Sequence, residues 1–369
     1  MTGYCALDVA KDDKKWFNRA LRNVTYSKSV NSQTKHLPID RNLLSEQPLV
    51  SMLLIAYRQA DTVREAIEGA LAQTYSPLEI IISDDTSDDD TWLQMQSAAA
   101  AYHGPHKIIL NRNQSNMGIG AHLSYLVSLS AGDLLFVTAG DDVSLPQRCE
   151  KVVAAWLASD CKLDLIASAL VDIDENGVLH GEIVPSPLQD WHTLDEWVAR
   201  PPYVVGAAQA WTRRLFECFG ALPPGTVAED LILVFRAIAS GGALTLREPL
   251  VRYRRGGLSR RVRSMSAHEV VQKLLKNNKH ALVETEQLLH DATRVNASAV
   301  VFANLEAKRA RERFIAELFA QRSLTGSIRL VLRASAVPIT LRLRLWCYAA
   351  IPWVLAPVFA LKRLVARGR

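Results

Sequence analysis

Short apolar runs alternate with amphipathic segments between residues 49 and 138. The apolar runs, such as Leu49–Ile55, have the length and composition of strands buried on both faces of a parallel sheet. After Asp61, apolar residues recur at helical spacing. Strands that alternate with helices in this way predict an α/β domain with a mostly parallel central sheet. The predicted strands are 49–55, 78–82, 107–110 and 134–138, and helices are expected from about 61, over about 89–102 and over about 120–130.

The pattern changes on both sides of this region. Residues 1–47 are polar and lack sustained periodicity, with one short helix expected around 16–21. Residues 160–260 contain less regular strands and loops, whereas residues 267–321 have the spacing of charged helices. The sequence therefore predicts four parts: an N-terminal extension (1–47), an α/β domain (48–262), a helical region (263–335) and a basic, apolar segment (336–369).

The last part combines positive charge with an uncharged apolar run. After Glu317 the chain has no Asp or Glu, while nine Arg and Lys residues follow. The uncharged run Leu345–Leu361 would form a helix of roughly 25 Å, shorter than the roughly 30 Å hydrocarbon core of a bilayer. Pro352 and Pro357 also interrupt it. The pattern favours contact with an anionic membrane surface, and a terminal helix packed on the domain is the alternative.

Composition and cysteine usage narrow the class of protein. A chain of 369 residues with 49% apolar and 22% charged residues is typical of a globular protein with one sizeable core and an appendage. The five cysteines are scattered and form no C-x-x-C pair, which argues against a disulfide framework or a zinc site. The first residues lack the apolar core of a secretory signal, so we expect a cytoplasmic protein.

Paired carboxylates follow two of the predicted strands. Asp84-Asp85 ends the second strand, and Asp141-Asp142 comes after the fourth. Because ligands of such sheets bind outside the carboxyl ends of the strands, we expect both pairs to face a binding site. Adjacent carboxylates are costly to bury unless a cation meets them, and Mg²⁺ shares oxygen ligands with phosphates. The pairs therefore point to a metal-bound, nucleotide-type ligand, with a solvated turn as the alternative for each pair.

Several sequence blocks occur in the order that is typical of one enzyme family. They are Val50–Tyr57, Ala66–Tyr75, Leu78–Asp88, Asn116–Gly120, Ala131–Asp142, Glu229–Leu231 and Tyr253–Ser259. Over about residues 48–260 the chain resembles the inverting glycosyltransferases of family 2. The resemblance implies a GT-A, Rossmann-like domain that binds a nucleotide sugar, followed here by the C-terminal helical region.

The resemblance also implies how the nucleotide is bound. Asp85 would accept a hydrogen bond from the base, Ala56 and Tyr57 would line that pocket, and Gly118 would belong to the same donor site. A place for Tyr57 in the core is the alternative to a place in the pocket wall. His122, in the following helix, is expected at a helix surface or core edge rather than as a ligand.

The reacting end of the site follows from the same resemblance. Asp141 would contact the ribose or the metal region, Asp142 would ligate Mg²⁺ or Mn²⁺ at the diphosphate, and Arg254 would meet phosphate oxygens. Asp230 would be the general base that removes the proton of the acceptor hydroxyl. It is favoured over Glu229, and the acidic first turn of a helix is the alternative for both. Three departures affect these assignments. The usual Asp-x-Asp motif is Gly140-Asp141-Asp142, the Arg-Asn pair that many members carry after the glycine turn is His122-Leu123, and the late loop lacks a histidine.

The implied function is a metal-dependent, inverting transfer of a sugar from a nucleoside diphosphate, with uridine or deoxythymidine favoured, to an acceptor hydroxyl. The basic C-terminal segment favours a saccharide or lipid-linked acceptor at the cytoplasmic face of the inner membrane, as in bacterial polysaccharide assembly. Specificity is expected in loops of residues 160–225, such as Gly206–Gln209.

Other classes of protein fit the sequence less well. A non-catalytic scaffold with the same fold is the alternative, although it needs no converging carboxylates. Gly118-x-Gly120 lacks the third glycine of a dinucleotide site, and the first strand lacks the glycine-rich loop of a pyrophosphorylase. No nucleic-acid partner is expected, because the C-terminal arginines flank an apolar segment.

Overall fold

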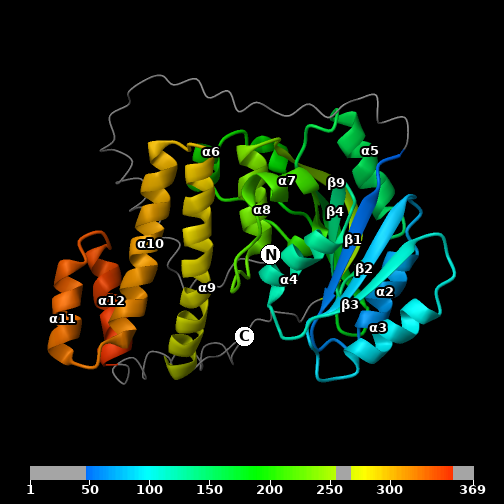
Figure 1. Ribbon diagram of the computed structural model, residues 1–369. Coiled ribbons are helices and arrows are strands. Elements are labelled where there is room, and N and C mark those ends of the chain that lie inside the picture. Colours follow the sequence, from blue (N-terminus) through cyan, green and yellow to red (C-terminus); the bar gives the residue numbers. More distant parts are fainter. Residues whose placement is uncertain (1–46, 255–266, 352–369) are drawn as a thin grey trace. The chain divides into compact units, whose positions relative to one another are not determined.

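The computed structural model describes residues 47–254 and 267–351. Residue contacts divide the chain into two compact units, with the described elements up to Arg254 in one and most of those from Ala267 in the other (Figure 1). We call them the α/β unit and the helical unit. The helix expected around residues 16–21 and the stretch 352–369 of the C-terminal segment lie outside the described residues.

The first half of the α/β unit has the predicted alternation of strands and helices. Each apolar run forms a strand whose residues are mostly buried, apart from the more exposed edge strand Lys107–Arg112. The prediction of an α/β domain is therefore confirmed for this region. The elements are β1 (Val50–Ala56), α2 (Val63–Leu71), β2 (Leu78–Asp84), α3 (Thr91–Ala100), β3 (Lys107–Arg112), α4 (Ile119–Leu129) and β4 (Leu134–Ala139).

The second half of the unit extends the same sheet with strands of both directions. Strand β9 (Ala243–Arg254) runs parallel to β6 (Leu165–Ile173), while β8 (Gln209–Thr212) is antiparallel to both β4 and β6. The elements are β5 (Val143–Ser144), α5 (Arg148–Ala158), β6 (Leu165–Ile173), β7 (Leu179–Ile183), the 3-10 helix η3 (Leu188–Asp190), α6 (Leu194–Ala199), the 3-10 helix η4 (Gly206–Ala208), β8 (Gln209–Thr212), α7 (Arg213–Phe219), α8 (Glu229–Ala239) and β9 (Ala243–Arg254).

The sheet has nine strands in the order β3-β2-β1-β4-β8-β6-β9-β5, with β7 paired to β6. Strands β1 to β4 form a wholly parallel block, because β1 pairs in parallel with β2 and β4, and β2 pairs in parallel with β3. The carboxyl ends of these four strands therefore lie at the same edge of the sheet.

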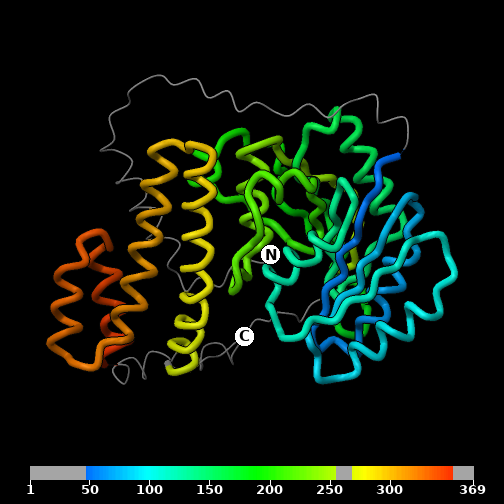
Figure 2. The backbone as a smooth tube through the Cα atoms, viewed as in Figure 1, coloured from blue at the N-terminus to red at the C-terminus, as the bar shows by residue number. Residues whose placement is uncertain are grey.

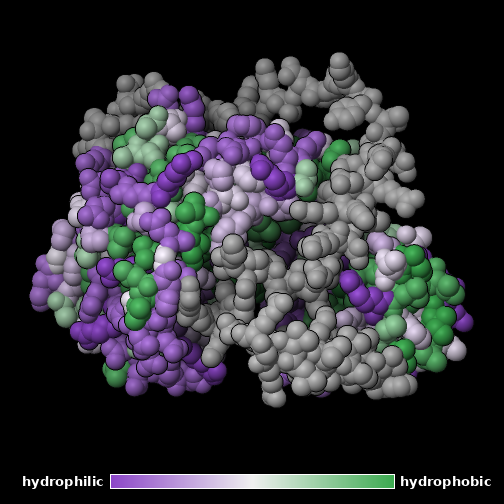
Figure 3. All heavy atoms as spheres, turned by 180° about the vertical axis from the view of Figure 1, so that it is seen from behind, coloured by the Kyte–Doolittle hydropathy of each residue, from purple (hydrophilic) through white to green (hydrophobic). Residues whose placement is uncertain are grey.

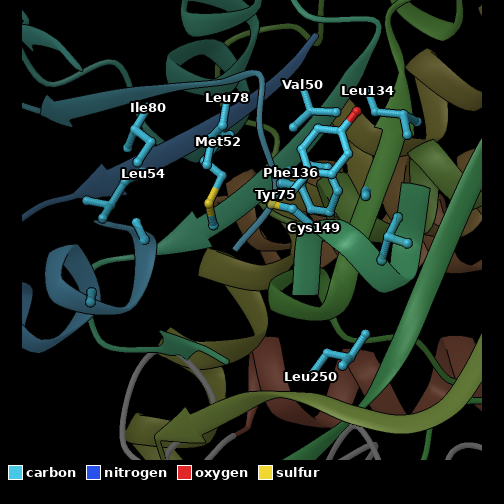
Figure 4. Close-up of a cluster of buried hydrophobic side chains, with 14 of the residues drawn as sticks. Val50, Met52, Leu54, Tyr75, Leu78, Ile80, Leu134, Phe136, Cys149 and Leu250 are labelled. Carbon is cyan, nitrogen blue, oxygen red and sulfur yellow. The ribbon is translucent and has the colours of Figure 1, made fainter. Parts of the chain in front are cut away.

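The main core lies between this parallel block and its helices (Figure 4). Met52, Ile80 and Phe136, from three adjacent strands, are fully buried in it. Tyr75 completes the core from the loop after α2, and its hydroxyl donates to the Pro48 carbonyl oxygen at 2.6 Å. Burial raises the pKa of Tyr75 to about 12. This core fixes the strand ends that carry the candidate site.

Two long helices, α9 (Ala267–Arg294) and α10 (Ala299–Ala320), begin the helical unit and run side by side (Figure 2). The buried Asn278 side chain of α9 donates to the carbonyl oxygen and the carboxylate of Glu312 on α10, at 2.9 and 2.8 Å. This finding agrees with the helical pattern predicted for residues 267–321. Of the described helices, none is both long and apolar enough to cross a bilayer.

Helices α11 (Leu324–Arg333) and α12 (Ile339–Ala350) pack with the end of α10 around a small second core. Leu345 of α12 is buried there with Phe314 and Val331, and the Trp346 indole donates to the Ser327 hydroxyl at 3.0 Å. Of the uncharged run Leu345–Leu361, the structure describes residues 345–351, in which Leu345 is buried and Trp346 and Ala349 are partly buried against this core.

Candidate functional site

The carboxyl ends of β1, β2 and β4 form one edge of the sheet, and the candidate residues follow them. The backbone N–H of Asp85, just after β2, donates to the carbonyl oxygen of Ala56 at 2.9 Å. The N–H of Gly140, just after β4, donates to the carbonyl oxygen of Ile55, also at 2.9 Å. The two loops that carry Asp85 and Asp141-Asp142 therefore leave the sheet on either side of β1. The structure brings both acidic loops to the edge where ligands of parallel sheets bind.

Asp85 organises the loop that leads into α4. One of its carboxylate oxygens accepts from the Asn113 side chain at 2.7 Å and from the Met117 N–H at 2.8 Å, and the other accepts from the Gly118 N–H at 2.9 Å. Gly118 has a φ of 72°, a left-handed conformation that favours glycine. A carboxylate has about four acceptor positions, so these three bonds use most of them. Base recognition by Asp85 stays a prediction.

Tyr57 and Arg58 form the exposed rim next to this loop. The Tyr57 ring is 41% exposed, and the Arg58 guanidinium lies 5.2 Å from the ring centroid. Arg58 also donates to both carboxylate oxygens of Asp88 at 2.7 Å. The aromatic ring is therefore held at the surface and not in the core. A flat ligand group can reach it there.

His122, on the first turns of α4, is buried behind the same loop. Its Nε2 lies 2.6 Å from the Ser83 hydroxyl. Burial lowers its pKa, while the charges of Asp85 and Asp84 oppose that shift. The imidazole belongs to the hydrogen-bond network beneath the strand end and lies away from the surface, as expected for a core-edge histidine.

Asp142 is the most deeply buried of the candidate carboxylates, with 3% of its surface exposed. It accepts a hydrogen bond from the backbone N–H of Arg254 at 2.9 Å. Burial, with the nearby charge of Asp141, raises the pKa of Asp142 well above its usual value. Burial also raises the pKa of Asp141, which is more exposed. The positive charge of Arg254 opposes both shifts, and that of Arg148 opposes the shift of Asp142, but burial outweighs them.

The Asp141-Asp142 pair fits a divalent cation on these grounds. A cation next to the pair would oppose both causes of the raised pKa values. Within residues 47–254 and 267–351, no group of three or more His, Cys, Asp and Glu side chains is arranged to hold a metal ion. A site that uses one or two carboxylates and completes its shell with phosphate oxygens and water suits Mg²⁺ or Mn²⁺.

Arg254 holds this acidic turn from β9. Its guanidinium donates to the carbonyl oxygens of Asp141 (3.1 Å), Asp174 (3.2 Å) and Glu175 (3.0 Å) and to the Glu65 carboxylate (2.6 Å). These four bonds use most of its five N–H groups. Arg254 therefore contacts both aspartates, one through its side chain and one through its backbone. Direct contact with phosphate stays a prediction.

Arg148 is a functional candidate that the sequence analysis missed. It is 1% exposed and donates to the carbonyl oxygens of Val137, Ala207 and Gln209 and to the Ser144 hydroxyl, at 2.8 to 3.1 Å. Burial lowers its pKa to about 10. A sequence feature that could have identified Arg148 is its position six residues after Asp142, at the start of an otherwise apolar helix face. That face consists of Cys149, Val152, Val153 and Trp156.

Asp230 lies in the first turn of α8 and is more exposed than Glu229, and its role as the general base stays a prediction. Its carbonyl oxygen accepts from the Gln209 side chain at 3.3 Å. Because Arg148 bonds to Gln209 and to Ser144, a continuous set of contacts joins the strand after Asp142 to the helix of Asp230. Gly206 lies against the same turn, since a Cβ there would be 2.9 Å from a Glu229 carboxylate oxygen.

Comparison with a family model identifies the region that contains the donor-side candidates. Residues 51–189 match the model described as Glycosyl transferase family 2. This range includes Ala56, Tyr57, Asp85, Gly118 and Asp141-Asp142, whereas Asp230 and Arg254 lie outside it.

Two curated relatives are similar over the same part of the chain. EpsE of Bacillus subtilis, named as a glycosyltransferase, is 34% identical over 143 residues, which are 39% of this chain and 50% of EpsE. The uncharacterized glycosyltransferase MJ1057 of Methanocaldococcus jannaschii is 29% identical over 142 residues, 38% of this chain and 48% of that protein. The chain thus spans about half the length of these relatives.

The fold is similar to that of a solved structure. The crystal structure of S. aureus TarS residues 1–349 in complex with UDP-GlcNAc has a TM-score of 0.51 and 14% sequence identity, and the match covers 85% of this chain and 87% of that one. At this identity the match concerns the fold. It confirms the predicted GT-A, Rossmann-like fold with a helical region after it.

Proposed function

We propose that this chain, whose residues 51–189 match the model of glycosyltransferase family 2, is an inverting glycosyltransferase that moves a sugar from a nucleoside diphosphate to an acceptor hydroxyl. The observation that supports this proposal most is the meeting of the Asp85 loop and the Asp141-Asp142 turn at one edge of the parallel strands. One loop is suited to the nucleoside and the other to the diphosphate.

The donor is proposed to lie along this edge, with its base near Tyr57 and the Asp85 loop. The exposed Tyr57 ring offers a stacking surface, and Gly118 lets the backbone of the next loop approach closely. A uridine nucleotide is the first donor to test, because TarS, which has a similar fold, was solved with UDP-GlcNAc.

Asp141 and Asp142 are proposed to hold Mg²⁺ or Mn²⁺. The ion, when bound, would neutralise charge on the departing diphosphate, so the leaving group needs no proton. Asp141 is the better placed of the two to meet a ligand, since Asp142 is almost wholly buried and bonded to the backbone of β9. Asp142 then sets the charge and the position of the turn.

Asp230 is proposed as the general base. It removes the proton from the acceptor hydroxyl while that oxygen attacks the anomeric carbon from the face opposite the leaving diphosphate, which inverts the configuration. The exposure of Asp230 and its indirect connection to the Asp142 turn through Gln209 and Arg148 support this assignment. We further propose a saccharide or lipid-linked acceptor and a place at the cytoplasmic face of a membrane, in keeping with polysaccharide assembly and with the basic C-terminal part of the chain.

Thermal unfolding with a panel of nucleoside diphosphates and nucleotide sugars, with and without Mn²⁺, tests the donor site. A ligand at about 100 times its Kd adds about 2.7 kcal/mol of stability, which a melting shift reveals. We expect the donor to raise the melting temperature only when Mn²⁺ is present, and we expect Asp141→Asn to lose this increase. The matched control is Asp190→Asn, at an exposed residue of η3, which should keep the wild-type shift.

Turnover is measured as release of nucleoside diphosphate, including slow transfer to water. Asp230→Asn should keep the donor-induced melting shift and lose turnover. Full turnover in Asp230→Asn would contradict its assignment as the base. A folded wild-type protein that responds to no donor would favour the non-catalytic scaffold.

A further inference from the structure

Exposed apolar side chains form a row on α11. Leu324, Ile328 and Leu332 are 58%, 42% and 72% exposed. They are spaced four residues apart, so they share one face of the helix. On α12, Ile339 and Leu343 repeat this spacing and are about half exposed. We call these five residues the apolar row. In Figure 3, hydrophobic side chains gather over α11 and α12, at the right of the view, with hydrophilic ones between them.

The row is separate from the core of the helical unit. Ser327 and Val331, on another face of α11, are buried against α12. The Ser323 hydroxyl caps the helix by accepting from the Gly326 N–H at 3.1 Å. The Trp346 indole bonds to Ser327. Packing on one side therefore fixes the orientation of α11 about its own axis. The apolar row lies on a face that does not take part in this packing.

Positive charge flanks the row. Arg329 and Arg333 are exposed and follow Ile328 and Leu332 directly in sequence, which places them beside the apolar face of α11. Arg344 follows Leu343 in the same way on α12. The chain has no acidic residue after Glu317. A helix with an apolar face and a basic border is suited to lie in the headgroup region of an anionic bilayer.

We propose that the apolar row of α11 and α12 inserts into the interface of an anionic lipid bilayer and is a membrane-docking surface of this protein. The long arginine stems lie along apolar surface while their charged ends reach the headgroups. Pairing of the row with a second copy would bring the same arginines of two chains together, and like charges oppose such a contact. This inference places a membrane contact on exposed side chains of α11 and α12, of which Ile339 and Leu343 belong to the predicted segment 336–369. It does not depend on the proposed catalytic chemistry.

Sedimentation with vesicles of phosphatidylcholine, with or without phosphatidylglycerol, tests the surface on the full chain. We expect wild-type protein to bind the anionic vesicles, and the double variant Ile328→Glu/Leu332→Glu to bind them at least about tenfold more weakly, because both apolar burial and charge attraction are reduced. Leu93→Glu and Leu157→Glu change equally exposed apolar residues of the α/β unit and should leave vesicle binding unchanged. Residues 352–369 are present in every variant, so the comparison isolates the row.

Wild-type binding by the double variant, or equal binding of the wild type to neutral and anionic vesicles, would overturn the proposal. Light scattering without lipid gives a second readout, since a wild-type dimer that dissociates in the double variant would show that the row pairs two copies. If the glutamates prevent folding, Arg329→Gln/Arg333→Gln replaces them and should weaken binding to anionic vesicles with little change in the melting temperature.

Discussion

Arginines in the two units lie in opposite environments. In the α/β unit, Arg148 and Arg254 are buried and each donates to four protein acceptors around the candidate site. In the helical unit, Arg329 and Arg333 are exposed beside apolar side chains. Buried arginines therefore fix loops by donating to several protein acceptors. Exposed arginines present their positive charge to the surroundings of the protein. Two predictions test this difference, and a third tests the charge of Asp142 in the turn that Arg254 holds.

The largest effect is expected for Arg148→Met. The variant leaves three buried carbonyl oxygens and the Ser144 hydroxyl without their donor, so the free energy of unfolding should fall by at least about 3 kcal/mol. Urea unfolding followed by tryptophan fluorescence measures it. Arg329→Met, the exposed counterpart, should change stability by less than about 0.5 kcal/mol. Equal losses in the two variants would remove the contrast between the two environments.

A smaller effect is expected for Arg254→Met, which should weaken stability by about 2 kcal/mol and raise the donor KM, since the Asp141-Asp142 turn loses its side-chain support. Glu65→Gln removes a more exposed partner of Arg254 and should cost less than about 1 kcal/mol. Melting and initial-rate measurements give both quantities. A lower donor KM in Glu65→Gln would instead indicate that the freed guanidinium binds the donor directly.

The smallest effect concerns the pH dependence of stability. Burial raises the pKa of Asp142 in the folded protein well above its usual value, so between these two pKa values the folded protein binds more protons than the unfolded protein. Its contribution to stability should therefore decrease as the pH rises through that window. In Asp142→Asn this part of the pH dependence should disappear, while the amide oxygen can still accept from the Arg254 N–H. Melting curves from pH 4 to 8 without divalent metal measure it, and an unchanged profile in the variant would contradict the raised pKa.

The sequence predicted the parallel block well because three of its four strands, β1, β2 and β4, are mainly apolar runs. Leu78–Ile82 and Leu134–Thr138 needed no knowledge of their neighbours to be recognised, and the acidic pairs at their ends indicated the site edge. The local pattern of apolar residues was enough to predict these strands, because strands that are buried on both faces are apolar along most of their length.

The rest of the unit depends on distant contacts that no local pattern records. Strand β9 pairs with β6 through two register shifts, and its Arg254 bonds to Glu65, which is far away in the sequence. Arg148 and Gln209 belong to the site only because η4 and β8 fold beside α5. The apolar row was likewise hidden, because the sequence shows leucines at helical spacing but not which of them the core covers.

The packing of α12 has a practical consequence for anyone who wishes to shorten this protein. A chain cut after Ala334 to improve handling would lose Leu345 and Trp346, so Phe314 and Val331 would face water. Such a truncation is expected to create a new exposed apolar surface in addition to Leu324, Ile328 and Leu332, which remain. Point substitutions at Ile328 and Leu332 reduce the exposed apolar area while every core contact is kept.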